Sequence, residues 1–172
     1  MAQRQDGIDV YVEDRLHQER RKTFAMKTIK VEQPVALACI FTWAGFICAI
    51  SFLEAWLKFR APGVTLPVGL GIGRLVFNAL NKVEWGFAAI VLMSAYLHNK
   101  LRPAAPLYLL LAVLAILLLQ TAWLLPELDA RASAIISGQA VPPSYLHFYF
   151  VGAELIKTFL IISYGIKLFK PL

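Results

Sequence analysis

The chain has 172 residues, of which 59% are hydrophobic and 16% charged, and its formal net charge is +6. Soluble domains usually carry about 45–50% apolar and about 25% charged residues, so this composition is typical of a membrane protein of one domain. The basic residues lie mostly at the ends and between apolar runs, without a recognisable nucleic-acid-binding module, which argues against nucleic acid as a partner.

Residues 1–33 form a polar, charge-dense segment before the first apolar run. A basic cluster lies directly in front of that run: Arg20, Arg21, Lys22, Lys27 and Lys30. Such a cluster favours the cytoplasmic side of a membrane and contacts anionic lipid headgroups. The alternative is that the segment docks a soluble partner.

The first predicted span covers about residues 35–57. Pro34 stands at the first helical position, where proline is tolerated, and the turn-forming residues 60–63 end the helix. The run is too long for the apolar part of a signal peptide, so we expect an uncleaved anchor. Cys39 and Cys48 lie too far apart on this helix to form a disulfide, and we interpret them as small buried hydrophobes.

The segment of residues 64–82 is less apolar and contains Gly69, Gly71 and Gly73. It is not a dinucleotide-binding loop, because no third glycine follows in register and no βαβ unit surrounds it. The spacing favours either a stripe of small residues on a helix or a re-entrant segment at the membrane interface. The second span is predicted over residues 75–97, with its most apolar part beginning at residue 83.

The third predicted span, about residues 106–125, has no polar face, which excludes a soluble helix. Pro126 is expected to stop it, and a short, partly apolar loop is expected to follow. The fourth span is predicted over residues 144–169, directly after Pro142 and Pro143. Four spans of about 20 residues each match a hydrocarbon thickness of about 30 Å.

The sequence therefore predicts an all-α polytopic membrane protein, with four transmembrane helices in a bundle over residues 34–172 and a charged N-terminal segment over residues 1–33. We expect close helix contacts at Gly45, Gly86 and Gly152. No internal repeat is evident, which disfavours an inverted-repeat transporter. Eleven Lys and Arg residues fall on the side of the two termini and five on the other, so both termini are predicted to be cytoplasmic. The compact termini and the lack of a targeting signal favour a bacterial inner membrane.

Six polar side chains within the predicted spans are candidates for a ligand or proton site: Glu54, Glu84, Gln120, His147, Glu154 and Lys157. With the predicted topology the first four converge on the outer leaflet, and the last two lie deeper. An unpaired lysine at that depth costs at least about 2.5–3.5 kcal/mol, so we expect Lys157 to pair with Glu154 one helical turn away.

Two interpretations of these charges stay open. Intramembrane charges favour a functional site, whereas a matched pair of Glu154 and Lys157 could serve only to fix helix packing. Glu54 can pair with Lys58, and Glu84 with Lys82 or Arg74, near the predicted helix ends. Simple solvation at the interface would then explain both carboxylates.

The sequence contains no GxSxG, HExxH or Walker motif, so no catalytic residue is assigned. A metal site built from His147, Glu54 and Glu84 would be rich in carboxylates and is less favoured. A haem between two histidines is disfavoured, because only His147 lies in a predicted span. No cofactor is predicted.

A pattern of scattered residues carries a resemblance to a known family: Trp43, Ala44 and Gly45, then Ala61 and Pro62, Pro126, and His147. It is similar to the small, functionally uncharacterised four-helix membrane proteins of the transmembrane protein 205 type. The resemblance covers about residues 35–169, implies a four-helix bundle and supplies no activity. The charged N-terminal segment departs from the pattern.

The leading functional prediction is a non-enzymatic integral membrane protein that serves as an accessory or scaffold subunit of a larger membrane assembly, with a membrane-protein partner or a second copy of itself. The alternative is the binding or transport of a small molecule, proton or ion through the polar site in the outer half of the bundle. An enzyme that acts on a lipid or quinone is a third reading, and the missing catalytic motif argues against it.

Overall fold

The structure is a computed structural model that describes residue 15 and residues 29–31, 33–98 and 105–171. Contacts divide the chain into residues 31–168, here called the helical unit, and a second unit of residues 1–30 and 169–172. The predictions for Arg20, Arg21, Lys22 and Lys27 lie outside the described residues. Lys30 belongs to β1 (Ile29–Val31), a short strand that pairs with β2 (Phe169–Pro171).

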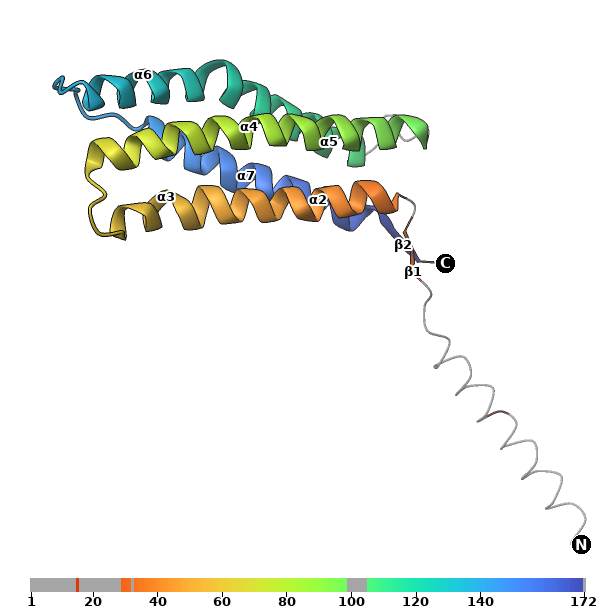
Figure 1. Cartoon of the computed structure of the whole chain (residues 1–172). Coiled ribbons are helices and arrows are strands. Elements are labelled where there is room, and N and C mark those ends of the chain that lie inside the picture. The colour runs from red at the N-terminus through yellow and green to blue at the C-terminus, as the bar shows by residue number, and fades with distance from the viewer. Residues whose placement is uncertain (1–14, 16–28, 32, 99–104, 172) are drawn as a thin grey trace, which may run out of the picture. The chain divides into compact units, whose positions relative to one another are not determined.

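The helical unit contains four stretches that are long and apolar enough to cross a membrane. They run over Pro34–Arg60, Leu66–Leu97, Pro106–Ile136 and Leu146–Lys167. Figure 1 shows them lying side by side along most of their length. The prediction of four apolar, membrane-length helices is confirmed.

The first stretch begins at Pro34, as predicted, and is not one uniform helix. It consists of α2 (Pro34–Ile47), the π-helical segment η1 (Cys48–Glu54), α3 (Ala55–Leu57) and the 3₁₀ turn η2 (Lys58–Arg60). The chain then reverses through Gly63, whose φ of 81° is a conformation that favours glycine.

The second stretch is the single helix α4 (Leu66–Leu97), nine residues longer at its start than the predicted span. The continuous helix contradicts the re-entrant alternative. The alternative of a small-residue stripe is confirmed for Gly69 and Gly73, while a Cβ atom at Gly71 would meet nothing within 4 Å. Gly69 and Gly73 are buried, and a Cβ atom at either position would collide with the Phe59 ring or the Lys58 ammonium.

The predicted close contacts at Gly45, Gly86 and Gly152 are wrong, because a Cβ atom at each of them would meet nothing within 4 Å. Small residues permit close helix contact only where they face a neighbouring helix. Gly45 and Gly86 instead lie on exposed faces of their helices.

The third stretch continues past Pro126, so the predicted helix end there is also wrong. It consists of α5 (Ala105–Leu119), the π-helical turn η3 (Gln120–Leu124) and α6 (Leu125–Ile136). In η3 the Leu125 backbone N–H donates to the carbonyl of Gln120, five residues earlier. This wider turn comes directly before the proline, where an ordinary α-helix would be kinked or broken. The fourth stretch is α7 (Leu146–Lys167).

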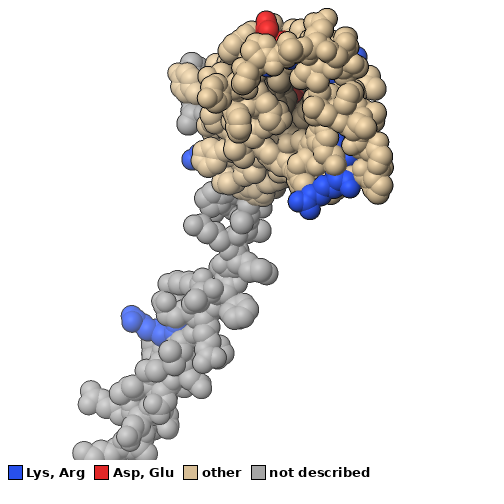
Figure 2. Space-filling view, turned by 90° about the vertical axis from the view of Figure 1, so that its left-hand side faces the viewer, with Lys and Arg blue, Asp and Glu red and all other residues tan. Residues whose placement is uncertain are grey.

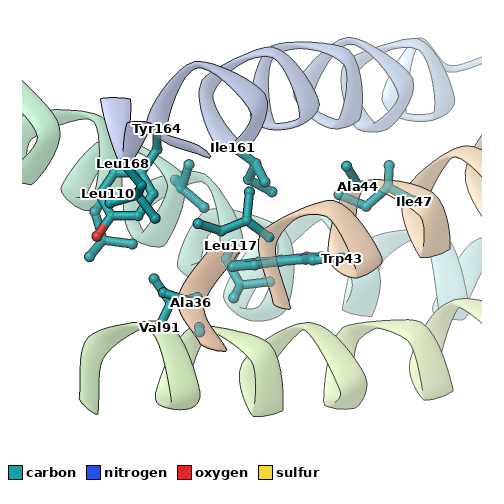
Figure 3. Close-up of a cluster of buried hydrophobic side chains, with 13 residues drawn as sticks. Ala36, Trp43, Ala44, Ile47, Val91, Leu110, Leu117, Ile161, Tyr164 and Leu168 are labelled. Carbon is teal, nitrogen blue, oxygen red and sulfur yellow. The ribbon is translucent and has the colours of Figure 1, made fainter. Parts of the chain in front are cut away.

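The four stretches contact one another in a definite order. α2 packs against α4 and α7, while α5 packs mainly against α7 and α6 mainly against α4. The third stretch thus changes its neighbour at η3. A cluster of buried side chains from α2, α4, α5 and α7 fills the space between them, and includes Trp43, Ile47, Val91, Leu117 and Ile161 (Figure 3).

Large apolar side chains also cover the outside of the helical unit. Leu75, Phe148 and Phe159 are each at least 70% exposed. Water would penalise so many exposed apolar side chains, so this surface suits contact with a lipid bilayer. Figure 2 views one end of the unit and shows few charged groups there.

Candidate functional site

Five polar side chains meet in the middle of the helical unit, and each is at most 2% exposed. We call this set the buried network: Trp43 of α2, Glu84 of α4, Gln120 of η3, and Glu154 and Lys157 of α7. All four stretches therefore contribute to it, which makes it a contact between distant parts of the chain.

The Lys157 ammonium is the centre of the buried network. It donates to Oε1 of Gln120 at 2.6 Å and to Oε1 of Glu154 at 3.1 Å, and it forms an ion pair with Oε1 of Glu84 at 2.6 Å. An ammonium has three N–H donors, and three oxygens surround this one. The predicted pair of Glu154 and Lys157 is present, with a second carboxylate added from α4.

Glu84 is buried and paired in a way that its sequence position did not indicate. Its Oε1 accepts from the indole Nε1 of Trp43 at 2.9 Å and also contacts Lys157. The predicted pairing with Lys82 or Arg74 at the interface is wrong. Since α4 begins at Leu66, Glu84 lies in the interior of a 32-residue helix, far from its end.

The two oxygens of Glu154 have different surroundings. Oε1 accepts from Nε2 of Gln120 at 2.8 Å and from Lys157. Oε2 is buried and has no hydrogen-bond partner among the described residues. Buried carboxylate oxygens are normally paired, so Oε2 is the open position of the buried network.

The charges of the buried network do not balance if both carboxyl groups are ionised. One ammonium then faces two carboxylates, which leaves a net charge of −1 in a site from which water is excluded. An uncompensated buried charge costs several kcal/mol. One bound proton makes the network neutral.

A second set of hydrogen bonds fixes the π-helical turn that carries Gln120. Thr121 Oγ1 accepts from Nδ2 of Asn81 at 2.9 Å and from Nε1 of Trp85 at 3.0 Å, both on α4. The same hydroxyl donates to the carbonyl of Leu117. These bonds attach η3 to α4 one residue from Gln120, and so hold its amide against Glu154.

The remaining two candidates, Glu54 and His147, lie away from the buried network. Oε2 of Glu54 accepts from Lys58 at 3.2 Å, the predicted pair four residues apart on one helix. His147 is exposed and borders a cavity of about 270 Å³ near the end of the unit where α4 and α7 begin. The expected convergence of His147 and Glu54 with Glu84 and Gln120 is wrong.

We call this space the end cavity. Its walls come from α3, η2, α4, α6 and α7, and its polar lining consists of Lys58, Arg74, Asn78, Asp129 and His147. Nε and Nη2 of Arg74 donate to the two oxygens of Asp129 at 2.6 and 2.8 Å, which joins α4 to α6. Figure 2 looks onto this end of the unit and shows a hollow near the middle of the face.

Aromatic side chains stand between the end cavity and the buried network. Phe77 lines the cavity, and its ring meets that of the buried Phe150 edge to face at 5.3 Å between centroids. Phe150 lies between His147 and Glu154 on α7. On the first stretch Ser51 lies between Trp43 and Lys58 in the sequence. It is buried, and its hydroxyl has no partner among the described residues.

Sequence reasoning missed Trp43, Arg74 and Asp129 as parts of these sites. Trp43 did give a signal, since an indole N–H inside a membrane helix needs an acceptor. Asp129 gave none, because it fell in an expected loop. Among the residues that the structure describes, no group of three His, Cys, Asp or Glu side chains could hold a metal ion.

Comparisons with known proteins found no relative of this chain. No family model, curated protein or solved structure matches the chain. The resemblance to proteins of the transmembrane protein 205 type therefore stays a prediction, and the function has to be argued from the site itself.

Proposed function

We propose that this chain is an integral membrane protein that binds and exchanges a proton at the buried network. The single observation that carries the proposal is the excess of one carboxyl group over ammonium groups in a site that is at most 2% exposed. Intramembrane ionisable groups mark proton or ion sites by default. The four helices form a transmembrane bundle in this proposal, with both termini in the cytoplasm of a bacterial cell.

The proton belongs on Oε2 of Glu154. Among the described residues, the polar groups around this carboxyl are Lys157 of the same helix, Glu84 of α4 and Gln120 of η3, with Trp43 donating to Glu84. Since Oε1 already accepts two hydrogen bonds, a proton added to Oε2 leaves all of them in place. Exchange of this proton changes the network charge by one.

The end cavity supplies the route for exchange. It reaches the Phe77 ring, and only about ten ångströms of helix separate His147 from Glu154 on α7. The buried Ser51 hydroxyl has no hydrogen-bond partner among the described residues. Along the first stretch it lies between Trp43 of the network and Lys58 of the cavity, so we assign it as the relay between the two sites. The aromatic side chains between the cavity and the network keep water from the network between exchange events.

Infrared difference spectroscopy of the full chain in liposomes, recorded between acidic and alkaline pH, tests the proposal. We expect the carbonyl band of a protonated carboxyl in a dry environment, and we expect it to disappear in Glu154→Gln. Glu54→Gln is the matched control, because it removes a carboxyl outside the network and should leave the band unchanged. Absence of the band at every pH, or its survival in both Glu154→Gln and Glu84→Gln, contradicts the proposal.

The rate of proton exchange tests the role of Ser51 independently of the proton site. In Ser51→Ala the deuterium shift of the same band after transfer into D₂O should develop more slowly, while its final size stays the same. An unchanged rate would remove Ser51 from the route and leave the proton site in place.

The accessory-subunit role is the second candidate, and one observation favours it. All three donors of Lys157 have oxygens nearby, which is also what a permanent structural crosslink requires. Native mass spectrometry of the chain released from membranes in mild detergent tests this role. A protein partner in fixed stoichiometry, retained when Glu154 and Lys157 are both replaced by apolar residues, would support a scaffold. A lone chain would count against it.

A further inference from the structure

We propose that the end cavity binds an amphiphile with one acidic head group, a carboxylate or a phosphate, and a single apolar chain. The inference uses the walls and charges of the cavity alone. It does not depend on proton binding at the buried network.

The walls of the end cavity suit an apolar chain. Phe59, Leu70, Phe77, Leu125 and Leu128 line it, on elements of the first three stretches. Its volume of about 270 Å³ lies just below the range of about 300–1,000 Å³ that drug-sized ligands occupy. One chain therefore fits, and the two chains of a phospholipid do not. The cavity lies near the ends of the helices, and in the transmembrane arrangement proposed above these ends would stand level with the lipid headgroups.

Lys58 places a positive charge in the wall. Its side chain is only 8% exposed, and its ammonium lies over the rings of Phe59 and Phe77 at 5.6 and 5.3 Å from the centroids. The ammonium also lies close to Gly73, where an added Cβ atom would stand 2.9 Å from Nζ. One hydrogen bond, 3.2 Å long, runs to Glu54. Two of its three N–H donors have no acceptor among the described residues.

The other polar groups of the cavity add donors. Arg74 uses two of its five N–H groups on Asp129, and both oxygens of Asp129 face Arg74. His147 stands at the rim, and its ring nitrogens have no hydrogen bond within the described part of the chain. Free donors therefore outnumber free acceptors, which is the pattern that oxyanions require.

The unused donors select the head group. Lys58 is paired with Glu54 and Arg74 with Asp129, so these four charges cancel. The N–H groups that the two pairs leave unused still require acceptors. The oxygens of an acidic head group supply them, whereas an ammonium head group has no acceptor and a neutral alcohol supplies a single oxygen.

The test uses the purified full chain in nanodiscs of phosphatidylcholine and four probes with the same chain length: dodecanoate, dodecyl phosphate, dodecanol and dodecyltrimethylammonium. Native mass spectrometry measures the number bound and the affinity. We expect one dodecanoate or dodecyl phosphate per chain, with dodecanol bound about tenfold or more weakly. A preference for the carboxylate identifies a free fatty acid as the source, and a preference for the phosphate identifies a single-chain phospholipid. Equal binding of dodecanol or dodecyltrimethylammonium overturns the proposal.

Variants assign the binding to the cavity. Lys58→Met should weaken binding of the acidic probes about tenfold or more and leave dodecanol unaffected, and Lys58→Arg should restore much of the loss. Lys82→Met, a lysine on the exposed surface of α4, is the matched control and should bind normally. Ala132→Phe places a ring in the cavity and should abolish binding. Full affinity in both Lys58→Met and Ala132→Phe contradicts the assignment.

A further variant keeps the two proposals apart. Glu154→Gln removes the proton site and should retain the acidic amphiphile, because Glu154 does not line the end cavity.

Discussion

The buried network and the end cavity each contain a lysine paired with a glutamate of the same helical stretch. The nitrogen-to-oxygen distances are nearly the same, 3.1 Å for Lys157 and Glu154 and 3.2 Å for Lys58 and Glu54. The surroundings differ. Lys157 is completely buried and contacts groups of three stretches. The side chain of Glu54 is instead 28% exposed, and the ammonium of Lys58 lies over aromatic rings. The distance within an ion pair therefore does not distinguish the two sites. The second carboxylate, Glu84, which contacts Lys157, distinguishes them.

Lys157→Met should have the largest effect on stability. It leaves Glu84 and Glu154 facing each other without a cation, and removal of one partner from a buried ion pair costs about 3–5 kcal/mol. Thermal unfolding of the detergent-solubilised protein measures the loss. Adding Glu84→Gln to Lys157→Met should recover part of it. A single variant as stable as the wild type would show that the network carries no net stabilisation.

Trp43→Phe should have the next largest effect. It keeps most of the buried ring and removes the indole N–H that Glu84 accepts, and a hydrogen bond to a charged group contributes about 1.5–3 kcal/mol. Trp85→Phe is the matched control, because its indole bonds the neutral Thr121 on an exposed face and should cost clearly less. Equal losses in the two variants would argue that Glu84 is not charged.

Gly69→Ala tests the contact between η2 and α4. The added methyl group collides with the Phe59 ring, and overpacking of this kind typically costs about 1–3 kcal/mol. Gly71→Ala, two residues away, meets nothing within 4 Å and should be neutral or slightly stabilising. Unfolding of both variants in parallel gives the comparison, and a neutral Gly69→Ala would place Phe59 elsewhere.

Arg74→Met should have the smallest effect on stability. Both partners of its pair with Asp129 are about one third exposed, and pairs of this kind contribute about 0–1 kcal/mol. The small loss should shrink further at high salt, because salt screens exposed charges. A loss as large as that in Lys157→Met would show that this pair is desolvated in the membrane.

Much of this structure could be predicted from local spacing in the sequence. The contacts between helices could not. The apolar runs located all four helices, and the pairs Glu154–Lys157 and Glu54–Lys58 follow from one helical turn. The partner of Glu84 depends on the register of α4 against α7, which no single helix encodes. Because α4 begins earlier than the predicted span, Glu84 was expected near a helix end at the interface, whereas it lies in the helix interior.

The third stretch illustrates the same limit at a single residue. A proline in a helix predicts an end or a kink, and Pro126 is accommodated because η3 comes just before it. Nothing in the sequence around Gln120 announces a π-helical turn. Because the helix was predicted to end at Pro126, Asp129 was placed in a loop. The contact of α4 with α6 at the end cavity was therefore not predicted.

The π-helical turn η3 acts as a phase shift in the third stretch. A wider turn corresponds to one inserted residue, and one residue rotates everything beyond it by about 100°. This rotation fits the exchange of neighbours, in which α5 faces α7 and α6 faces α4. Deleting one residue from η3 would return the stretch to a uniform helix and turn Asp129 away from Arg74. The turn η3 thus sets the rotation of α6 relative to α5 within one stretch. Residues in the middle of the molecule and residues at its rim can therefore change separately during evolution.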